Sequence, residues 1–307
     1  MHVVVGAGPV GTAVAQLLVD RGEEVKLVTR SGSGPDHPAL TKVAADASDP
    51  AALSAIVDGA STLVSAGGPP YPQWVSHWPA LGASLVAAAE KTGAVLVTTG
   101  NLYPYGAPDG PMREQDPDRP NSTKGKVRAQ VWADALAAHR AGRIRTTEVR
   151  GSDYLGAGAV SFFTVGVLPG LLKGKQVAVP ADLDAPHSWT AVDDVARTLV
   201  AVAGDENAWG RTWLVPTAPP VSIRDLAAHA ARLAGLPAAR VSEMPGVVLW
   251  LGGLFNPPVK EIRELQYQFR KPFVIDSTQA EEAFGIQPVP TEDALRATVE
   301  AARGGNQ

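Results

Sequence analysis

The first residues that suggest chemistry are glycines at a fixed spacing near the start of the chain. Gly6-Ala7-Gly8-Pro9-Val10-Gly11 fits the pattern G-x-G-x-x-G. It follows the apolar segment His2–Val5 and opens a segment with helical apolar spacing, which is the context in which this pattern binds dinucleotides. Gly6 would allow a tight turn, Gly8 would let the backbone approach a pyrophosphate, and Gly11 would let the helix lie close to the sheet. The amides at the start of that helix would bind the phosphates.

The residues after the second predicted strand select between the two nicotinamide cofactors. A chain that binds NAD usually carries Asp or Glu about 20 residues after the glycines, where it holds the ribose 2′-OH. Here Val25–Val28 is followed by Thr29-Arg30-Ser31-Gly32, with no carboxylate at that strand end. An Arg pairs with a 2′-phosphate and stacks on adenine, so Arg30 and Ser31 predict NADP, with NAD as the less favoured cofactor. The alternative is that Arg30 is a solvated surface residue.

A carboxylate after the third predicted strand is a further cofactor candidate. Asp46 could cap the adenine amino group, and it equally fits a turn in Asp46-Ala47-Ser48-Asp49-Pro50.

The elements that must position these residues alternate between strand and helix through the first half of the chain. Strands are predicted at His2–Val5, Val25–Val28, Lys42–Ala44, Thr62–Ser65, Val95–Thr98 and Thr146–Arg150. Helices are predicted at Val10–Arg21, Ala51–Val57, Pro79–Lys91 and Lys126–Arg140, the third with its proline near the first turn. This alternation predicts an α/β fold: a Rossmann-type doubly wound parallel sheet with helices on both faces.

The second half of the chain contains more prolines and longer irregular pieces. We therefore expect a smaller C-terminal α/β substrate domain. The predicted division gives residues 1–152 and about 187–210 to the dinucleotide-binding domain, and about 153–186 and 211–303 to the substrate-binding domain.

Composition excludes several classes of protein. The 307 residues are 45% hydrophobic and 19% charged, with a net charge of −4, which excludes a disordered chain and argues against a nucleic-acid partner. The absence of cysteine excludes disulfides, thiolate metal sites and a Cys nucleophile. The six histidines show no paired spacing, so we expect no metal site. The apolar stretches Val160–Leu172 and Met244–Phe255 are interrupted, and no targeting segment precedes them, so we expect no membrane association and a cytoplasmic protein.

Several segments together resemble one family along essentially the whole chain. With these segments the sequence resembles an extended or atypical short-chain dehydrogenase/reductase of the NAD-dependent epimerase/dehydratase type. The segments are the glycine motif, Ser65-Ala66-Gly67-Gly68, Thr98-Thr99-Gly100-Asn101-Leu102-Tyr103, Arg150-Gly151-Ser152-Asp153-Tyr154-Leu155-Gly156, and His187 to Ala196 with its Val-Asp-Asp-Val-Ala core.

The resemblance implies roles for individual residues. Ala66, Gly67, Gly68 and Gly151 would lie along the cofactor. Thr99 matches the Ser or Thr that hydrogen-bonds the substrate carbonyl, and Tyr103 matches a Tyr at the strand end. Lys126 would bridge the nicotinamide ribose and assist catalysis; the alternative is a solvated basic turn.

The chain departs from the family pattern at the catalytic tyrosine. The family places a Tyr four residues before its Lys, and the corresponding position here is Ser122, or Pro120 if Lys124 is the family Lys. Another acid must then act, and Tyr103, Tyr105 and Tyr154 are the candidates, with Tyr103 favoured. Lys126 and the cofactor could lower the pKa of such a phenol, or Lys126 could donate through water.

Aromatic residues predict where a substrate would lie. Tyr71 and Trp74 follow the fourth predicted strand, and Tyr154 and Phe162 follow the sixth, so they would lie beyond the carboxyl ends of the strands. Ordinary loop packing explains each of them as well.

These observations favour an NADP(H)-dependent oxidoreductase that reduces a small organic substrate. Two alternatives stay open: a sugar-type epimerase or dehydratase with transient oxidation, and a non-catalytic NADP-binding sensor. We expect a small-molecule substrate, and the sequence also allows a homodimer.

Overall fold

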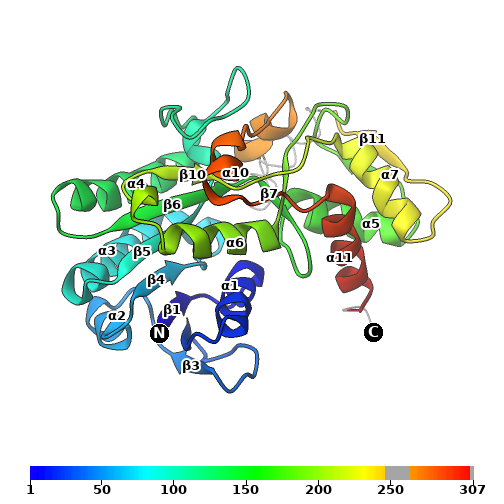
Figure 1. The fold of residues 1–307 in the computed structure, drawn as a ribbon. Coiled ribbons are helices and arrows are strands. Elements are labelled where there is room, and N and C mark those ends of the chain that lie inside the picture. The colour runs from blue at the N-terminus through cyan, green and yellow to red at the C-terminus, as the bar shows by residue number, and fades with distance from the viewer. Residues whose placement is uncertain (246–262, 305–307) are drawn as a thin grey trace.

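The computed structural model describes residues 1–245 and 263–304, and its centre is a seven-stranded parallel sheet (Figure 1). The strand order is β10-β6-β5-β4-β1-β2-β3, so the order reverses between β1 and β4. The strands are β1 His2–Val5, β2 Val25–Thr29, β3 Leu40–Ala44, β4 Thr62–Ser65, β5 Val95–Asn101, β6 Thr146–Gly151 and β10 Thr212–Leu214. The predicted doubly wound α/β fold is confirmed.

Helices cover both faces of this sheet (Figure 1). Helices α1 (Pro9–Asp20) and α6 (Val192–Ala203) share one apolar core with Val4 of β1. On the other face, Val3 and Val5 lie in a core with α2 (Pro50–Val57) and α3 (Trp74–Thr92), and α4 (Thr123–Arg140) packs beside α3. Successive side chains of a strand point to opposite faces, which is why the apolar run of β1 is buried on both sides.

A second group of elements packs around its own apolar core beyond the carboxyl edge of the sheet (Figure 1). Two small sheets pair β7 (Asp153–Leu155) with β9 (Trp189–Ala191), and β8 (Val177–Val179) with β11 (Val241–Glu243). The helices here are α5 (Leu168–Leu172), α7 (Ile223–Leu233) and α11 (Thr291–Gly304). A π-helical turn at Phe163–Val167 leads directly into α5. This arrangement agrees with the expected smaller α/β unit.

The unit boundary differs from the expected one. Strand β10 lies within the span 211–303 that we assigned to the substrate domain, yet it pairs with β6 as the edge strand of the main sheet. Helix α10 (Thr278–Phe284) also packs toward this sheet, because the Phe284 ring lies 4.6 Å from that of Trp213. A strand of three residues is too short to show a periodicity.

Two helices begin earlier than predicted. Helix α3 begins at Trp74 and contains Pro79 in its interior. The buried rings of Trp74 and Trp78 hold this first turn in place. Pro79 has no N–H group to donate to the Val75 carbonyl, and Val75 is exposed. Helix α4 begins at Thr123, where the Ser122 hydroxyl accepts a hydrogen bond from the Gly125 amide.

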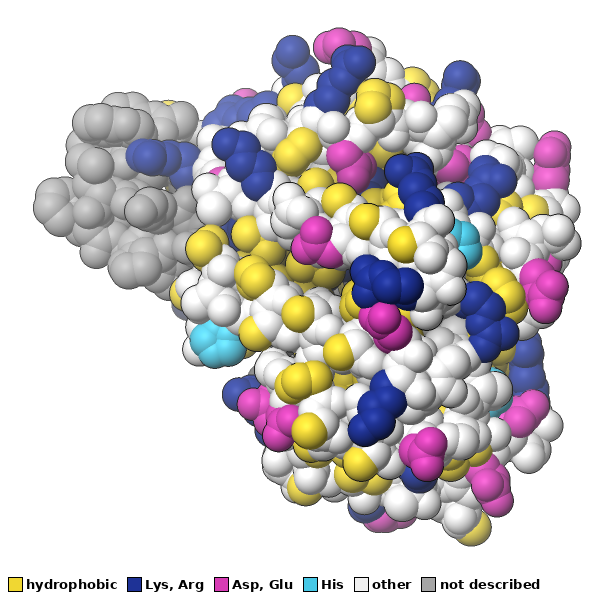
Figure 2. All heavy atoms as spheres, turned by 90° about the vertical axis from the view of Figure 1, so that its left-hand side faces the viewer, with side chains coloured by type: hydrophobic (Ala, Val, Ile, Leu, Met, Phe, Trp, Pro, Cys, Tyr) yellow, Lys and Arg dark blue, Asp and Glu magenta, His cyan; other side chains and the backbone are white. Residues whose placement is uncertain are grey.

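The outer surface of the sheet unit carries charges of both signs. Figure 2 shows Lys and Arg side chains interspersed with Asp and Glu on the side where α2, α3 and α4 lie. Among the described residues, no helix is both long and apolar enough to cross a membrane. Most of the apolar stretch Met244–Phe255 lies outside the described residues.

Candidate active site

Two glycine turns meet at the point where the strand order reverses. Gly6, directly after β1, has a φ of +102°, and a Cβ atom there would lie 2.6 Å from the Cα atom of Gly67, after β4. The Ala66 amide donates to the Val5 carbonyl at 2.9 Å, which holds the second turn against the first. Ligands of open parallel sheets bind at such a reversal point, beyond the carboxyl ends of the strands.

The start of α1 faces this point with its amides. Gly8 is the N-cap residue, and no side chain caps the helix within the described part of the chain. A Cβ atom on Gly8 would meet nothing within 4 Å, whereas one on Gly11 would collide with the Gly6 carbonyl oxygen. Gly11 is therefore required for the helix to approach the strand, and Gly8 leaves open space beside an uncapped, positive helix end.

The expected adenine-side residues lie at the ends of β2 and β3. Arg30 and Ser31 are exposed, and the Ser31 hydroxyl lies 3.0 Å from that of Ser33. Within residues 1–245 and 263–304, Arg30 forms no ion pair. Asp46 is also exposed, and one of its oxygens accepts the Ser48 amide at 2.9 Å, so it closes the turn that was its alternative role.

An aromatic cluster joins the loops after β4 and β5. The hydroxyls of Tyr71 and Tyr103 lie 2.6 Å apart, and the ring of Trp74 lies 4.9 Å from that of Tyr71 and 5.9 Å from that of Tyr103. The Trp74 indole nitrogen donates to the Pro69 carbonyl at 2.9 Å. Three of the expected site residues are thus brought together. Tyr71 remains 44% exposed and presents this cluster to solvent.

The glycine segment after β4 is continuous with this cluster. A Cβ atom on Gly68 would lie 2.5 Å from the Trp78 ring, so the indole packs directly on the backbone there. The guanidinium of Arg128 stacks on the Trp78 ring, 4.0 Å from the ring centroid. This stack connects the expected cofactor segment to helix α4.

The expected lowering of the Tyr103 pKa is wrong. Burial raises the pKa of Tyr103 well above its ordinary value, and the neighbouring Tyr71 and Asp153 raise it further. Burial also raises the pKa of Tyr154, and it raises that of Tyr105 to about 12 although Arg150 opposes it. A carboxylate and other phenols surround these hydroxyls, so ionisation is disfavoured at each of them.

Lys126, the other expected catalytic residue, is exposed on α4. The buried cations of this helix are instead Lys124 and Arg128, whose residues are 3% and 2% exposed. They are four residues apart and share one helix face with the buried Trp132, whereas Lys126 falls between them on another face. Arg128 Nη2 donates to the Thr99 carbonyl oxygen at 2.7 Å.

Thr99 lies near the end of β5, where it was expected. Its side-chain oxygen is buried and has no hydrogen-bond partner among the described residues, and the same holds for Nε of Arg128. Arg128 contacts Thr99 through the Thr99 backbone carbonyl. Buried polar atoms nearly always have partners, so a ligand group is expected to supply them.

A buried charge network supports this neighbourhood from β6. Glu148 lies between two arginines, 2.6 Å from Arg150 Nε and 3.4 Å from Arg128 Nη2. Arg150 also holds Asp118 in a two-bond pairing at 2.6 and 3.1 Å, and its own pKa is raised by these carboxylates against the effect of burial. Gly100 makes room for the network, since a Cβ atom there would lie 2.8 Å from both Glu148 and Arg150.

The residues after β6 lie at the junction with the second unit. Gly151 is buried, and a Cβ atom added there would lie 2.9 Å from the Tyr154 ring. The Tyr154 hydroxyl lies 3.5 Å from the Gly100 carbonyl oxygen. Phe162 stacks on Phe269 at 4.4 Å, within the second core. Phe162 is therefore placed apart from the aromatic cluster of Tyr71, Trp74 and Tyr103.

An acid–histidine pair is also present at this junction. Asp153 Oδ2 lies 3.1 Å from His187 Nε2, and its other oxygen accepts the Phe162 amide at 3.0 Å. The His187 ring is stacked on Phe269 and Phe273. Packing thus fixes the direction in which the Asp153 carboxylate points.

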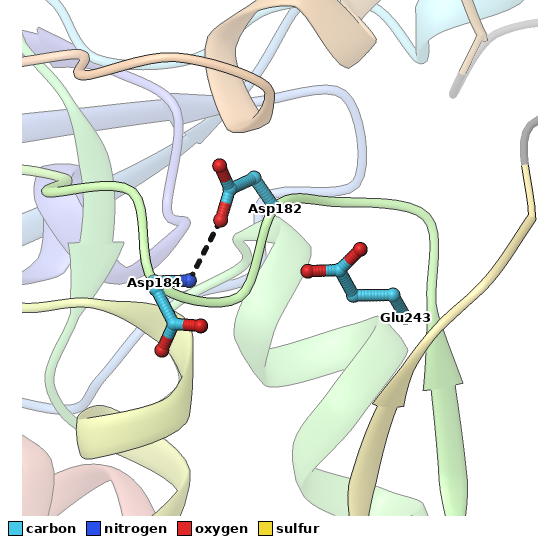
Figure 3. Close-up of side chains that lie close together, drawn as sticks. All are labelled: Asp182, Asp184 and Glu243. Atoms are coloured by element: carbon cyan, nitrogen blue, oxygen red, sulfur yellow. Dashed lines mark hydrogen bonds between the residues drawn. The ribbon is translucent and has the colours of Figure 1, made fainter.

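Three carboxylates lie together in the second unit, away from this site (Figure 3). The Asp182 carboxylate accepts the Asp184 amide at 2.9 Å, the Glu243 carboxylate accepts the Leu183 amide at 3.4 Å, and Arg224 pairs with Asp184 at 2.7 Å. Each of the three carboxylates therefore already has a hydrogen-bond or ion-pair partner within the chain. The expectation of no metal site stays a prediction.

Sequence reasoning missed Arg128 and Glu148, and it kept Lys124 only as the alternative to Lys126. The signal for Arg128 and Lys124 is the spacing of four that runs back from Trp132, which continues the buried face of α4 to both residues. Glu148 carries no such signal, because a charge inside a predicted strand is buried only where a cation faces it.

Comparisons with known proteins agree with this geometry. The sequence model of the NAD dependent epimerase/dehydratase family matches residues 2–215. A curated relative, dTDP-6-deoxy-L-talose 4-dehydrogenase (NAD(P)(+)) of Kitasatospora kifunensis, is 32% identical over 222 residues, which are 66% of this chain and 69% of that protein.

Solved structures show the same fold at lower identity. The UDP-glucose 4-epimerase of Thermotoga maritima, solved with UDP-glucose, is 17% identical over all of both chains, with a TM-score of 0.81. A double mutant of the dTDP-glucose 4,6-dehydratase DesIV of Streptomyces venezuelae, solved with NAD, is 19% identical over 99% of this chain and 97% of that chain, with a TM-score of 0.78. The family match spans well over half of the chain, and the chain belongs to the NAD dependent epimerase/dehydratase family.

Proposed function

We propose that this protein is an NADP(H)-dependent oxidoreductase that reduces a carbonyl group on a sugar nucleotide. The observation that carries the proposal is the placement of the open, uncapped start of α1 at Gly8 beside the exposed Arg30 at the end of the neighbouring β2. A pyrophosphate suits the first position and a 2′-phosphate suits the second.

The residues present fit a nicotinamide dinucleotide. Gly6 and Gly67 keep the floor of the site free of side chains, and Gly8 leaves space where a larger residue would stand. At the other end, the unpartnered Thr99 hydroxyl and Arg128 Nε offer polar contacts. A bound nicotinamide would supply or accept the hydride; the chain would bind it, orient the substrate and move the proton.

The substrate class is supported by the relatives. The Kitasatospora enzyme is by name a dehydrogenase of dTDP-6-deoxy-L-talose, and the Thermotoga structure contains UDP-glucose. In this chain, the rings of Tyr71 and Trp74 lie at the carboxyl edge of the sheet, where they could contact a sugar or a base.

One observation favours a second function, a non-catalytic NADP-binding sensor. Helix α4 has no tyrosine, and burial raises the pKa of Tyr103 and Tyr154, so the usual phenol chemistry is absent from the described site. The same observation counts against an epimerase or dehydratase, which needs a strong base to begin oxidation.

Two measurements separate these functions. The protein is titrated with NADPH and with NADH, and the dissociation constants are obtained from quenching of tryptophan fluorescence or from energy transfer to the reduced nicotinamide. NADPH is expected to bind more tightly. Oxidation of dTDP-6-deoxy-L-talose by NADP⁺, followed by the absorbance of the reduced nicotinamide, then tests the reaction in its reverse direction. Tight NADPH binding without turnover would support the sensor, and equal affinities would overturn the NADP preference.

A further inference from the structure

Helix α4 directs two buried cations toward the carboxyl edge of the sheet. Lys124 and Arg128 are one turn apart on the face that packs against the sheet and the turn after β5. A Cβ atom on Gly125 would lie 2.6 Å from the Tyr103 carbonyl oxygen, so the first turn of the helix is held directly against that turn. Burial of a lysine has a cost that its surroundings must offset.

The ammonium of Lys124 is held at the aromatic cluster. Its Nζ atom lies 2.6 Å from Glu264 Oε2 and 5.5 Å from the centroid of the Tyr71 ring. Tyr71 is in turn hydrogen-bonded to Tyr103. Lys124 is therefore a buried proton carrier next to residues expected to contact substrate.

Arg128 and Thr99 lie one turn further into the site. Both carry a buried polar atom without a partner in residues 1–245 and 263–304, Nε of Arg128 and Oγ1 of Thr99. A substrate oxygen is a suitable partner for either atom, because an N–H group and a hydroxyl can each donate to it.

We propose that Lys124 is the proton-transfer residue of this enzyme, and that Arg128 holds the substrate oxygen on which it acts. The inference rests on the proposed oxidoreductase function and names the residue that the missing helix tyrosine leaves open. The high pKa of Tyr103 agrees with it, since that phenol is a poor base.

The reaction balances with groups named above. In the reducing direction, bound reduced nicotinamide would supply a hydride to the carbonyl carbon and would itself be oxidised, and the carbonyl oxygen would gain a proton from Lys124 Nζ. A C–H and an O–H bond form, the C=O double bond becomes single, and an N–H bond of the ammonium breaks. Lys124 is left as a neutral amine, and water returns its proton.

Variants of Lys124 test the role by activity. K124R keeps a positive charge and a donor for Glu264, but a guanidinium does not release a proton at ordinary pH. We expect kcat for NADP⁺ and dTDP-6-deoxy-L-talose to fall about 10²- to 10⁴-fold, with an unchanged dissociation constant for NADPH. K124M should lose as much activity. K91M, on the exposed end of α3, is the matched control and should behave as the parent.

A second readout does not depend on turnover. In protein made with isotope-labelled lysine, the NMR resonance that disappears in K124R belongs to Lys124. Titration with NADP⁺ should shift this resonance, because the nicotinamide is expected to bind beside the Lys124 ammonium. A resonance that does not shift on binding of NADP⁺, or full kcat in K124R, overturns the role of Lys124.

The outcomes separate this inference from the proposed function. If the parent does not bind NADPH, the oxidoreductase proposal fails. If it binds NADPH but does not oxidise dTDP-6-deoxy-L-talose, the proposed substrate class is contradicted and the titration decides the role of Lys124. If it turns over and K124R does as well, only the role of Lys124 fails.

Discussion

The Nζ atom of Lys124 lies 2.6 Å from one carboxylate oxygen of Glu264, and the Lys124 backbone amide donates to the other oxygen at 3.0 Å. Glu264 stands 140 residues further along the chain, so the pair joins the first turn of α4 to the segment that precedes the turn at Gln266–Phe269. A carboxylate at a helix N-terminus also interacts favourably with the helix dipole. The pair therefore connects the sheet unit with the C-terminal part of the chain.

This pair predicts a pH dependence of stability. Burial acts to raise the pKa of Glu264, but the hydrogen bonds from Lys124 outweigh it and hold the pKa below its ordinary value of 4.5. A pKa that is lower in the folded state stabilises the fold above the unfolded value, and this contribution is lost as pH falls through the folded value. We expect the difference in unfolding free energy between the parent and Glu264→Gln to be constant near neutral pH and to shrink below 4.5. Urea unfolding at several pH values measures it, and a difference that is independent of pH would contradict the linkage.

The glycines of the first turn should separate binding from folding. Gly8→Val is expected to fold normally, because a Cβ atom there meets no atom within 4 Å, and to lose NADPH binding, because the side chain takes the space of the pyrophosphate. Gly11→Ala is expected to destabilise the protein, because its Cβ atom would collide with the Gly6 carbonyl oxygen. Circular dichroism melting and NADPH titration of both variants test this. Normal NADPH binding by Gly8→Val would mean that the turn has only a structural role.

Arg30 should set the preference for NADP(H). Arg30→Ala is expected to weaken NADPH binding by about 1–3 kcal/mol, or about 5- to 150-fold in Kd, because a charge-assisted contact to the 2′-phosphate is lost. The affinity for NADH should not change, since NADH has no such phosphate. Arg140→Ala is the matched control, because Arg140 is an exposed arginine at the far end of α4. Parallel losses for NADPH and NADH would argue against a phosphate contact.

Glu148 should be important for stability. Glu148→Gln leaves Arg128 and Arg150 buried side by side without the carboxylate between them, and removal of one partner from a buried ion pair costs about 3–5 kcal/mol. The control is Glu90→Gln, which removes an exposed pair with Arg143 and is expected to cost about 0–1 kcal/mol. Denaturant unfolding gives both values. Equal costs would show that the network at β6 contributes no more than a surface pair.

The fold could be predicted further than the site. Apolar spacing located the strands of the first half and the glycine motif located the turn after β1, because both signals are local in sequence. Strand β10 and the Glu264 contact could not be predicted in this way, since they depend on pairing between distant segments. Lys126 was expected in the site from its match to a motif, and the helix period puts Lys124 and Arg128, not Lys126, on the buried face of α4. Burial of the Tyr103 hydroxyl depends on the loop that carries Tyr71, which no local pattern shows.

Tyr103→Phe decides between the phenol and the lysine as the proton carrier. Because burial, Tyr71 and Asp153 all raise the pKa of Tyr103, its hydroxyl stays protonated and serves as a hydrogen-bond partner of Tyr71. We expect the variant to lose less than about tenfold in kcat with NADP⁺ and dTDP-6-deoxy-L-talose, compared with 10²–10⁴ for loss of a general acid. The pH profile should keep its shape.

Tyr71→Phe removes the same hydrogen bond from the other side, and it serves as the matched variant. The two single variants should have similar effects, and the double variant should lose little more than either, because one interaction is shared between them. If Tyr103→Phe alone loses 100-fold or more while Tyr71→Phe retains activity, the phenol touches the reacting oxygen itself. Lys124 would then act at most by holding Glu264 and the first turn of α4 in place.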